Sequence, residues 1–279
     1  LCCPIPLDLD VTPRADVCTR ALEACEDGAQ LSLTAEKKLL IKSGAFQIYV
    51  DCLDEAFPNI HPEGKRVELD GKLLHAIKLL APCIAEDASR KWAQGILLRG
   101  PSAFATNNVV LAEYWLGYSF PVEINISKLA VAELLRIGEE PIALQVSEES
   151  VTFHYEGNRW LRAQNSPTTW PDVGAILDGE SNMPDGWEIG EEFFAALDRL
   201  VPFADALGQV FFCGDKLSTV PAGGLGASVA IATPPTGIYH AKQLQLLGQL
   251  GATSVCWRHP APSLFYGEKV RGAIVGIRG

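Results

Sequence analysis

The sequence predicts an α+β fold made of repeated half-domains, each with a strand, a helix and three further strands in the order βαβββ. Residues 120–171 follow this order in their pattern of apolar and polar residues. Three landmarks of that stretch recur 113 positions earlier in the chain: Leu31 for Leu144, Gly44 for Gly157, and Phe57-Pro58 for Trp170-Pro171. Because separate landmarks share one spacing, the two stretches are predicted to have the same fold.

The unit at residues 120–171 shows its elements by their patterns. Residues 121–126 alternate like a strand, and Ser127 follows as the N-cap of a helix over 128–136. Three short alternating runs, separated by polar turns, are predicted strands: 142–146, 150–155 and 160–163.

The first 66 residues are predicted to form a domain with one such half-domain. Its strands and helix are expected at residues 5–11, 13–24, 29–33 and 38–42. The stretch His61–Arg66 is polar and rich in turn residues, which places the first domain boundary near residue 66.

The rest of the chain is predicted to form two domains, 67–178 and 179–279, joined by a Gly-, Pro- and acid-rich linker over 178–188. Four residues of the helix at 69–80 and the turn after it recur 120 positions later: Leu73, Ala76, Leu80 and Pro82 as Phe193, Ala196, Leu200 and Pro202. The other predicted elements are a hairpin at 95–98 and 102–105, helices at 191–200 and 238–250, and strands at 254–257, 263–266 and 272–277. The predicted helices number five.

The composition is that of an acidic globular protein of 279 residues and 30.1 kDa, with net charge -11 and a pI near 4.9. This charge argues against general electrostatic adhesion to nucleic acid, but screening over about 8 Å leaves room for a local basic surface. The eight cysteines show no metal-ligand spacing and no disulfide framework, which is typical of a reducing cytosol. Neither a membrane span nor a signal peptide is found, so a cytoplasmic protein without a membrane partner is expected.

Two motifs resemble catalytic or nucleotide-binding sequences but lack their structural context. Asp8-Leu-Asp10-Val-Thr12 has the DxDxT pattern of phosphotransferases, yet prolines interrupt the buried strand that such chemistry needs. Gly223-Gly-Leu-Gly226 could cradle a phosphate only before a helix, and residues 227–232 are predicted to be a strand. The histidines are scattered, so no enzyme activity, catalytic residue, metal or cofactor is predicted.

A strand that ends in Phe104-Ala105-Thr106 leads into a polar turn, a long strand, a Ser-Lys helix and Trp170-Pro171-Asp172. This order resembles the DNA polymerase sliding clamps of bacteria and their phages, the β-subunit type of DNA polymerase III. The family has Ala-Thr-Asp-Gly-His-Arg-Leu where residues 105–111 read Ala-Thr-Asn-Asn-Val-Val-Leu, which predicts a divergent, phage-encoded clamp. The resemblance covers nearly the whole chain and implies the DNA-clamp fold, with helices lining a central hole and sheets outside.

The resemblance further implies that duplex DNA passes through this hole and that cations on the helices contact its phosphates without reading the base sequence. The expected DNA-binding residues are Lys72, Lys78, Arg90, Lys91, Lys128, Arg136, Arg199 and Lys242.

A second implication is that a DNA polymerase and a clamp loader each dock a short apolar peptide in a pocket between the second and third domains. The expected pocket residues are Thr106, Val109, Val110, Leu111, Ile176, Leu177, Val275 and Ile277. Two chains are expected to close a homodimeric ring in which Phe46 and Ile48 of one subunit meet Pro202 and Phe203 of the other.

The predicted number of half-domains leaves alternatives open. Five fit neither the six of a bacterial clamp chain nor the four of the eukaryotic type. Leu1 aligns near residues 119–120 of the repeat, which predicts that the first half of domain one is missing from this chain; a shorter clamp is the alternative. A metabolic enzyme and a repeat-built interaction protein unrelated to DNA are the other function classes considered.

Overall fold

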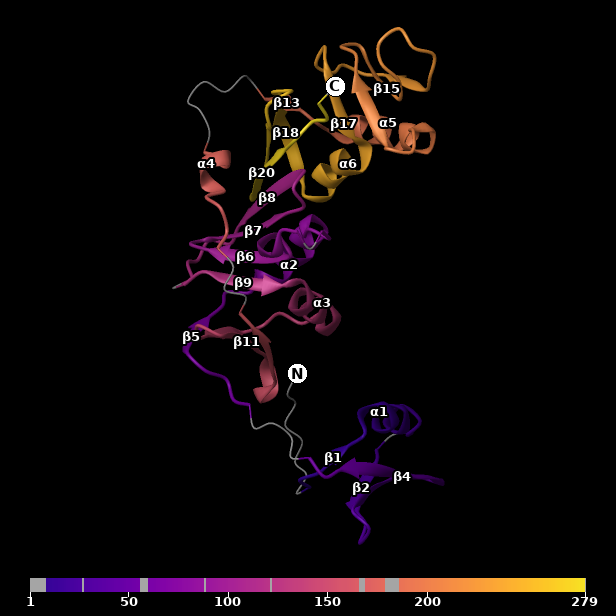
Figure 1. The fold of residues 1–279 in the computed structure, drawn as a ribbon, viewed down its shortest axis with the longest axis vertical. Coiled ribbons are helices and arrows are strands. Elements are labelled where there is room, and N and C mark those ends of the chain that lie inside the picture. Colours follow the sequence, from indigo (N-terminus) through magenta and orange to yellow (C-terminus); the bar gives the residue numbers. More distant parts are fainter. Residues whose placement is uncertain are drawn as a thin grey trace. The chain divides into compact units, whose positions relative to one another are not determined.

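The computed structural model describes residues 9–26, 28–55, 60–87, 89–120, 122–165, 169–178 and 186–278 (Figure 1). The chain divides into two compact units, of which the smaller ends at Pro62 and the larger begins at Glu63. The landmark Phe57-Pro58, residues 5–8 of the predicted first strand and Asp8 of the DxDxT motif lie outside the described residues. No described helix combines the length and apolar character needed to cross a membrane.

The smaller unit is one βαβββ half-domain, and its antiparallel sheet has the order β1-β4-β3-β2. Its elements are β1 (Thr12–Pro13), α1 (Ala15–Glu23), β2 (Gln30–Leu33), β3 (Lys38–Ser43) and β4 (Phe46–Leu53). Its small core is formed by Ala21, Leu39, Ile41 and Val50. A strand was predicted over residues 5–11, but the strand that the structure describes there, β1, comprises Thr12 and Pro13. Thr12 pairs with Leu53, the last residue of β4, and of the predicted residues those that the structure describes, 9–11, precede β1 and lie outside it.

The larger unit contains four more βαβββ repeats. The first is β5 (Lys65–Glu68), α2 (Leu73–Leu80), β6 (Gly95–Arg99), β7 (Ser102–Thr106) and β8 (Val110–Trp115). The second is β9 (Ile124–Ser127), α3 (Lys128–Ile137), β10 (Ala143–Val146), β11 (Ser150–His154) and β12 (Trp160–Gln164). The third is β13 (Trp187–Glu188), α5 (Glu191–Leu200), β14 (Gln209–Phe212), β15 (Lys216–Ser218) and β16 (Ser228–Ala230). The fourth is β17 (Gly237–His240), α6 (Ala241–Gln249), β18 (Ala252–Cys256), β19 (Ser263–Gly267) and β20 (Val270–Ile274).

Short helical segments lie between and within these repeats. The 3₁₀ turns are η1 (Ala81–Cys83), η2 (Lys91–Ala93), η3 (Glu156–Asn158) and η4 (Val201–Phe203), and α4 (Gly174–Leu177) is a single helical turn. The five predicted helices are therefore confirmed as α1, α2, α3, α5 and α6, while α4 was not expected.

The predicted repeat spacing is present in the structure. Helices α1 and α3 begin 113 positions apart, and so do strands β2 and β10. Gly44 and Gly157 both have a positive φ, 55° and 71°, which glycine adopts without the strain that a Cβ atom would cause. The prediction of repeated βαβββ half-domains is confirmed.

The repeats of the larger unit share three antiparallel sheets. Their strand orders are β12-β11-β10-β5, β16-β15-β14-β17 and β13-β18-β19-β20-β8-β7-β6-β9. The eight-stranded sheet is continuous because β8 pairs with β20, from Val110 opposite Ile274 to Tyr114 opposite Val270. Strands from the predicted second and third domains therefore lie in one sheet.

The two faces of the eight-stranded sheet pack against different layers. Val110 and Ala112 of β8 belong to the larger core, together with apolar residues of α2, α3, α5 and α6. Leu111, between them, points to the opposite face and packs with Trp170, Val173 and the α4 residue Leu177. In Figure 1, α2, α3, α5 and α6 accordingly lie on one side of the larger unit and α4 on the other. The four long helices thus share one face.

Two predicted helices begin later than expected. The helix predicted from residue 69 begins at Leu73, because Gly71 has a φ of 87° and ends the preceding segment in a turn. The helix predicted from residue 238 begins at Ala241. Residues 237–240 form β17 instead, with Tyr239 buried and paired with Val210 of β14.

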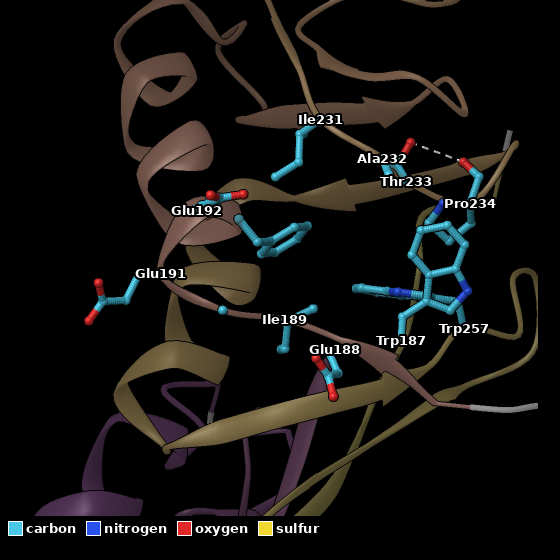
Figure 2. Close-up of a pocket in the computed structure, with 12 residues that line it drawn as sticks. Trp187, Glu188, Ile189, Glu191, Glu192, Ile231, Ala232, Thr233, Pro234 and Trp257 are labelled. Atoms are coloured by element: carbon cyan, nitrogen blue, oxygen red, sulfur yellow. Dashed lines mark hydrogen bonds between the residues drawn. The ribbon is translucent and has the colours of Figure 1, made fainter.

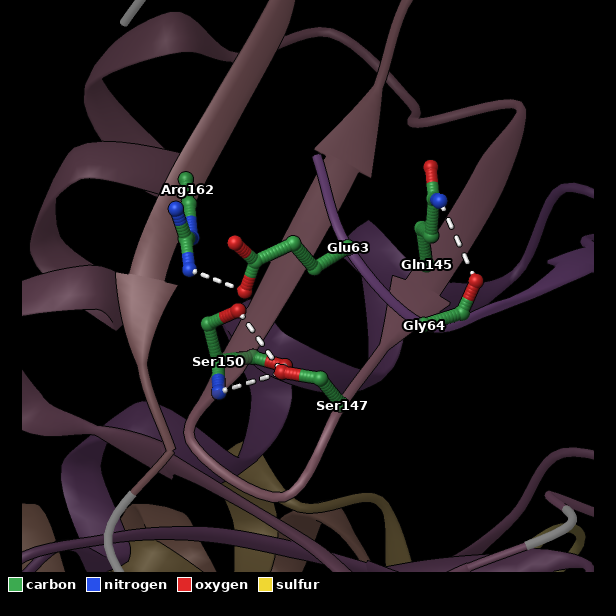
Figure 3. A network of polar contacts seen from close by, with 6 residues as sticks. All are labelled: Glu63, Gly64, Gln145, Ser147, Ser150 and Arg162. Atoms are coloured by element: carbon green, nitrogen blue, oxygen red, sulfur yellow. Dashed lines mark hydrogen bonds and ion pairs between the residues drawn. The ribbon is translucent and has the colours of Figure 1, made fainter. Parts of the chain in front are cut away.

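An ion pair and a hydrogen bond connect the first residues of the larger unit to the sheet that contains β10, β11 and β12 (Figure 3). The Glu63 carboxylate pairs with Arg162 at 2.8 Å, and the Gln145 side-chain amide donates to the Gly64 carbonyl at 3.1 Å. Gly64 has a φ of 93°, and a Cβ atom there would lie 1.9 Å from the Val146 carbonyl oxygen. Only glycine fits this close approach of two backbones.

Candidate functional site

Four predicted DNA-binding cations extend from the exposed side of the long helices. They are Lys78 on α2, Lys128 on α3, Arg199 on α5 and Lys242 on α6. None of the four forms an ion pair with another residue in the described part of the chain. Lys128 and Lys242 lie in the first turn of their helices, where unpaired backbone N–H groups add positive potential. These positions suit contact with an anion such as a phosphate.

Three of the remaining predicted cations already have a partner. Lys72, just before α2, pairs with Asp70 at 3.2 Å, and Arg136 pairs with Glu133 at 2.8 Å. The hydrogen bond to Glu133 raises the pKa of the exposed Arg136 guanidinium. Arg90 donates to the Asn108 side chain at 2.8 Å. Lys91 is exposed on η2.

Acidic side chains share the same helices, and they set the local charge balance. The exposed or half-buried acids are Glu133 on α3 and Glu191, Glu192 and Asp198 on α5. The Asp198 carboxylate accepts a hydrogen bond from Gln245 of α6 at 2.6 Å, which ties α5 to α6. The helix face therefore carries both signs of charge, with unpaired cations at four points.

The predicted peptide-pocket residues fall into exposed and buried groups. Ile176 of α4 is 45% exposed and Val275, just after β20, is 38% exposed. Val109 and Ile277 are half-buried, whereas Thr106, Leu111 and Leu177 are buried. Val110 was also predicted to line the pocket, but its position in the structure does not allow this. Its side chain has no exposed surface and packs on the helix side of the sheet, so a partner peptide cannot reach it.

The β7–β8 turn is held by Asn107, a residue the sequence analysis did not single out. Its side-chain oxygen accepts hydrogen bonds from the backbone N–H groups of Val109 and Val110, at 3.1 and 2.8 Å. Its side-chain nitrogen donates to Gln243 of α6 at 2.9 Å. Asn108 has a φ of 71°, which Asn tolerates better than most residues. An Asn-Asn pair between two predicted strands is the signal that could have identified this turn.

The residues after β20 are fixed beside that turn. The Val275 N–H donates to the Val109 carbonyl at 2.9 Å, and the Ile277 N–H donates to the Ile238 carbonyl at 2.7 Å. His259 Nε2 lies 2.9 Å from the Ile277 carbonyl oxygen. The turn and the C-terminal segment therefore form one surface in which Val109 and Val275 are neighbours.

A buried carboxylate and an arginine place α4 against this surface. Glu113 of β8, largely buried, accepts hydrogen bonds from Ser102 at 2.6 Å and from Arg271 of β20 at 2.5 Å. Arg271 also reaches Asp178, the residue after α4, at 2.8 Å. Burial lowers the pKa of Arg271, but the hydrogen bonds to both carboxylates more than offset this and raise it. No sequence pattern connected these three residues.

Solved structures of bacterial sliding clamps match the chain along nearly its whole length. The β sliding clamp of Caulobacter crescentus aligns with a TM-score of 0.82 over 96% of this chain and 82% of that chain, at 18% identity. The sliding clamp of Pseudomonas aeruginosa, its DNA polymerase III subunit β, gives 0.79 over 96% and 81%, at 15% identity. The chain has the β sliding clamp fold. The Helicobacter pylori β clamp also matches, at 0.79 over 96% and 81% with 17% identity. No protein-family model and no curated protein matches the sequence.

The predicted ring-interface residues of this clamp fold lie in two elements. Phe46 and Ile48 are half-buried in β4, on the face that packs toward α1. Strand β4 pairs with β3 along one edge, whereas on its other edge β1 covers only Cys52 and Leu53, so among the described residues that edge is unpaired between Phe46 and Val50. Pro202 and Phe203 lie in η4 and not in an edge strand, because Pro202 cannot donate to a strand ladder. Phe203 is 67% exposed.

The two motifs set aside earlier have ordinary structural settings within the clamp fold. Gly223–Gly226 lies in the hairpin between β15 and β16, and no helix follows it. Asp10 and Thr12 lie at the start of the smaller unit, on either side of Val11. Among the residues that the structure describes, no group of three or more His, Cys, Asp or Glu side chains could hold a metal ion.

Proposed function

We propose that this chain is a sliding clamp that encircles duplex DNA and tethers a replicative DNA polymerase to it as a processivity factor. The observation that supports this most is the clamp fold itself, which extends over 96% of the chain in the alignment with the Caulobacter crescentus β sliding clamp. Polymerase tethering follows from the relative in Pseudomonas aeruginosa, which is named as a subunit of DNA polymerase III.

The helix face suits contact with DNA of any sequence. Lys78, Lys128, Arg199 and Lys242 are long, exposed and free of ion pairs with other described residues, so they can follow phosphates without a fixed geometry. Phosphate contacts carry no base information and exchange readily along the duplex. An acidic protein with a few such cations holds DNA loosely, which is what sliding requires.

Charge reversal on this face tests the proposal. We expect Lys128→Glu combined with Lys242→Glu to shorten retention on circular DNA and to reduce the slope of log affinity against log salt by about 1 to 2, since each lost phosphate contact removes about 0.9. Retention is measured by gel filtration of protein and nicked plasmid at several salt concentrations.

A matched control makes the same change in net charge away from the helices. Lys42 and Lys65 are exposed on strands β3 and β5, and Lys42→Glu with Lys65→Glu should leave retention near that of the unmodified chain. Equal losses in the two double variants would mean that net charge, and not the helix face, governs binding.

Ring closure is proposed to use the free edge of β4 in one subunit and η4 of another. Burying an exposed phenylalanine contributes about 1.5 to 3 kcal/mol, so Phe203→Arg should weaken self-association by about tenfold or more. Sedimentation velocity over a concentration series measures this shift from dimer to monomer. Leu225→Arg, at a fully exposed loop position, is the control, and an unaltered dimer in Phe203→Arg would reject this interface.

The partner site is proposed to be the surface formed by the β7–β8 turn, α4 and the residues after β20. Ile176, Val109, Val275 and Ile277 present apolar surface there. The Glu113–Arg271–Asp178 contacts hold α4 in place beside it. A polymerase or clamp loader would insert the Leu or Phe of a short peptide at this surface.

A further inference from the structure

The four repeats of the larger unit form two pairs that exchange their first strands. Strand β5 of the first repeat pairs with β10 of the second, and β9 of the second pairs with β6 of the first. In the same way β17 pairs with β14, and β13 pairs with β18; Figure 2 shows Trp187 and Glu188 of β13. The second strand of every repeat in the larger unit is therefore paired along one edge with the first strand of the partner repeat.

The helices of each pair also pack against each other, α2 against α3 and α5 against α6. Gly248 of α6 lies at such a contact, because a Cβ atom there would be 3.0 Å from the Phe194 ring of α5. Helices α1, α3 and α6 begin at a constant spacing of 113 positions. By that spacing, Leu22 of α1 is equivalent to Leu135 of α3 and to Gly248, so it occupies a position where a partner helix packs.

Within the smaller unit, the described residues provide no partner repeat. Strand β2, equivalent to β10 by the same spacing, is the last strand of its sheet and pairs only with β3 there. Its final residue, Leu33, is 45% exposed, whereas the equivalent Val146 of β10 is 6% exposed. Leu22 is 46% exposed, whereas its equivalent Leu135 is half-buried. The positions that a partner repeat covers in the larger unit are open in the smaller one.

The core of the smaller unit is correspondingly small. On α1 only Ala21 is buried, whereas α3 buries Ala130, Val131 and Leu134. Domains of about 60 residues are marginally stable because they bury a small share of their surface on folding. Covering Leu22 would extend this core, so the smaller unit gains stability from a partner at these positions.

We propose that the smaller unit binds a βαβββ half-domain of a separate polypeptide. The first strand of that half-domain pairs with the open edge of β2, the edge away from β3, and its helix packs on Leu22 of α1. The four repeats of the larger unit are paired with one another, so they are not available as this partner. The proposal depends on how the repeats pair and is independent of DNA binding.

The backbone of β2 is oriented for such a strand. The Thr34 N–H, directly after β2, donates to the Lys38 carbonyl at 2.9 Å. Because N–H groups alternate in direction along a strand, those of Leu31 and Leu33 point to the open edge. An edge with free backbone groups pairs readily with a strand from another chain.

Co-expression with a defined half-domain tests the proposal on the full chain. The probe is a separate polypeptide with the sequence of residues 63–118, which contains the first repeat; the second repeat, its partner in the larger unit, is equivalent to the smaller unit. We expect the probe to co-purify with the tagged full chain as a one-to-one complex. The amides of residues 30–33 should exchange with deuterium at least about tenfold more slowly in the complex than in the chain alone.

Matched substitutions on α1 locate the helix contact. Leu22→Glu should lower the yield of complex by about tenfold or more, because it places a charge where the partner helix packs. Thr19→Glu adds the same charge at another exposed position of α1, equivalent to the exposed Ala132 of α3, and should leave the yield unchanged. The deuterium measurement on the unmodified chain needs no substitution, so it remains informative even if Leu22→Glu fails to fold.

Several results would overturn the proposal. They are the absence of a complex, equal yields with Leu22→Glu and Thr19→Glu, and a complex in which residues 30–33 exchange as fast as in the chain alone. Slow exchange of residues 30–33 without the probe, in a dimer that Leu22→Glu dissociates, would identify a second copy of this chain as the occupant instead. DNA retention is measured without the probe, so failure here is distinct from failure of the clamp proposal.

Discussion

Replacing Ile176 and Val275 together by Glu should lower the affinity for a polymerase peptide with a Leu or Phe anchor by a hundredfold or more. Both side chains are substantially exposed, so the change should leave folding intact. Burial of one apolar anchor contributes about 1.5 to 3 kcal/mol, and two carboxylates at the same surface would add a desolvation cost. The affinity is measured by anisotropy of a labelled peptide, with circular dichroism to confirm the fold.

The matched control places the same two charges on exposed apolar residues elsewhere. Val122→Glu with Leu225→Glu should bind the peptide as the unmodified chain does. Leu111 and Leu177 are unsuitable for this test because both are buried, and a charge there would disrupt the packing. Native affinity in a folded Ile176→Glu, Val275→Glu variant would place the partner site elsewhere.

Replacing Gly272 by Val should lower the free energy of unfolding of the larger unit by about 3 kcal/mol or more. A Cβ atom at Gly272 would lie 2.2 Å from the Leu111 carbonyl oxygen and 2.2 Å from the Phe265 ring. Because Gly272 lies in β20 opposite Ala112 of β8, the clash would push apart the strands that join the two halves of the eight-stranded sheet. Urea denaturation monitored by tryptophan fluorescence measures the loss.

Gly186→Ala is the control for this substitution. A Cβ atom at Gly186 would meet Ser254 and Cys256 only at 3.5 Å or more, which is ordinary van der Waals contact. Its urea midpoint should stay within a few tenths of a molar unit of the original, as for most mild surface changes. A stable Gly272→Val variant would contradict the strand pairing between β8 and β20.

The repeat and most element positions were predictable from the sequence, whereas the partners of the strands were not. A common spacing identifies equivalent elements, α3 begins directly after its predicted N-cap Ser127, and α5 spans the predicted residues 191–200. Strand β9 follows the same local rules as β1, yet β9 pairs with β6 and not within its own repeat. Which sheet a strand joins depends on contacts far apart in the sequence, which local alternation does not specify.

In the candidate sites, too, some features could be predicted from the sequence and others could not. The pairing of Arg136 with Glu133 follows from their i, i+3 spacing on a helix and could have been expected. Val110 and Leu111 are both apolar, and alternation places them on opposite faces without saying which face a partner can reach. The contact of Arg271 with Glu113 and Asp178 joins residues 158 and 93 positions apart, which only the folded sheet brings together.

The central claim, that the protein encircles DNA, is tested most directly by comparing closed and open DNA of the same sequence. The full chain is loaded onto a nicked circular plasmid, isolated by gel filtration, and the plasmid is then cut once with a restriction enzyme. A clamp held by topology stays on the circle, leaves within minutes when the ends are made, and stays when both ends are blocked by bound protein. Equal retention on circular and linear DNA, or no retention on the circle, would contradict the account.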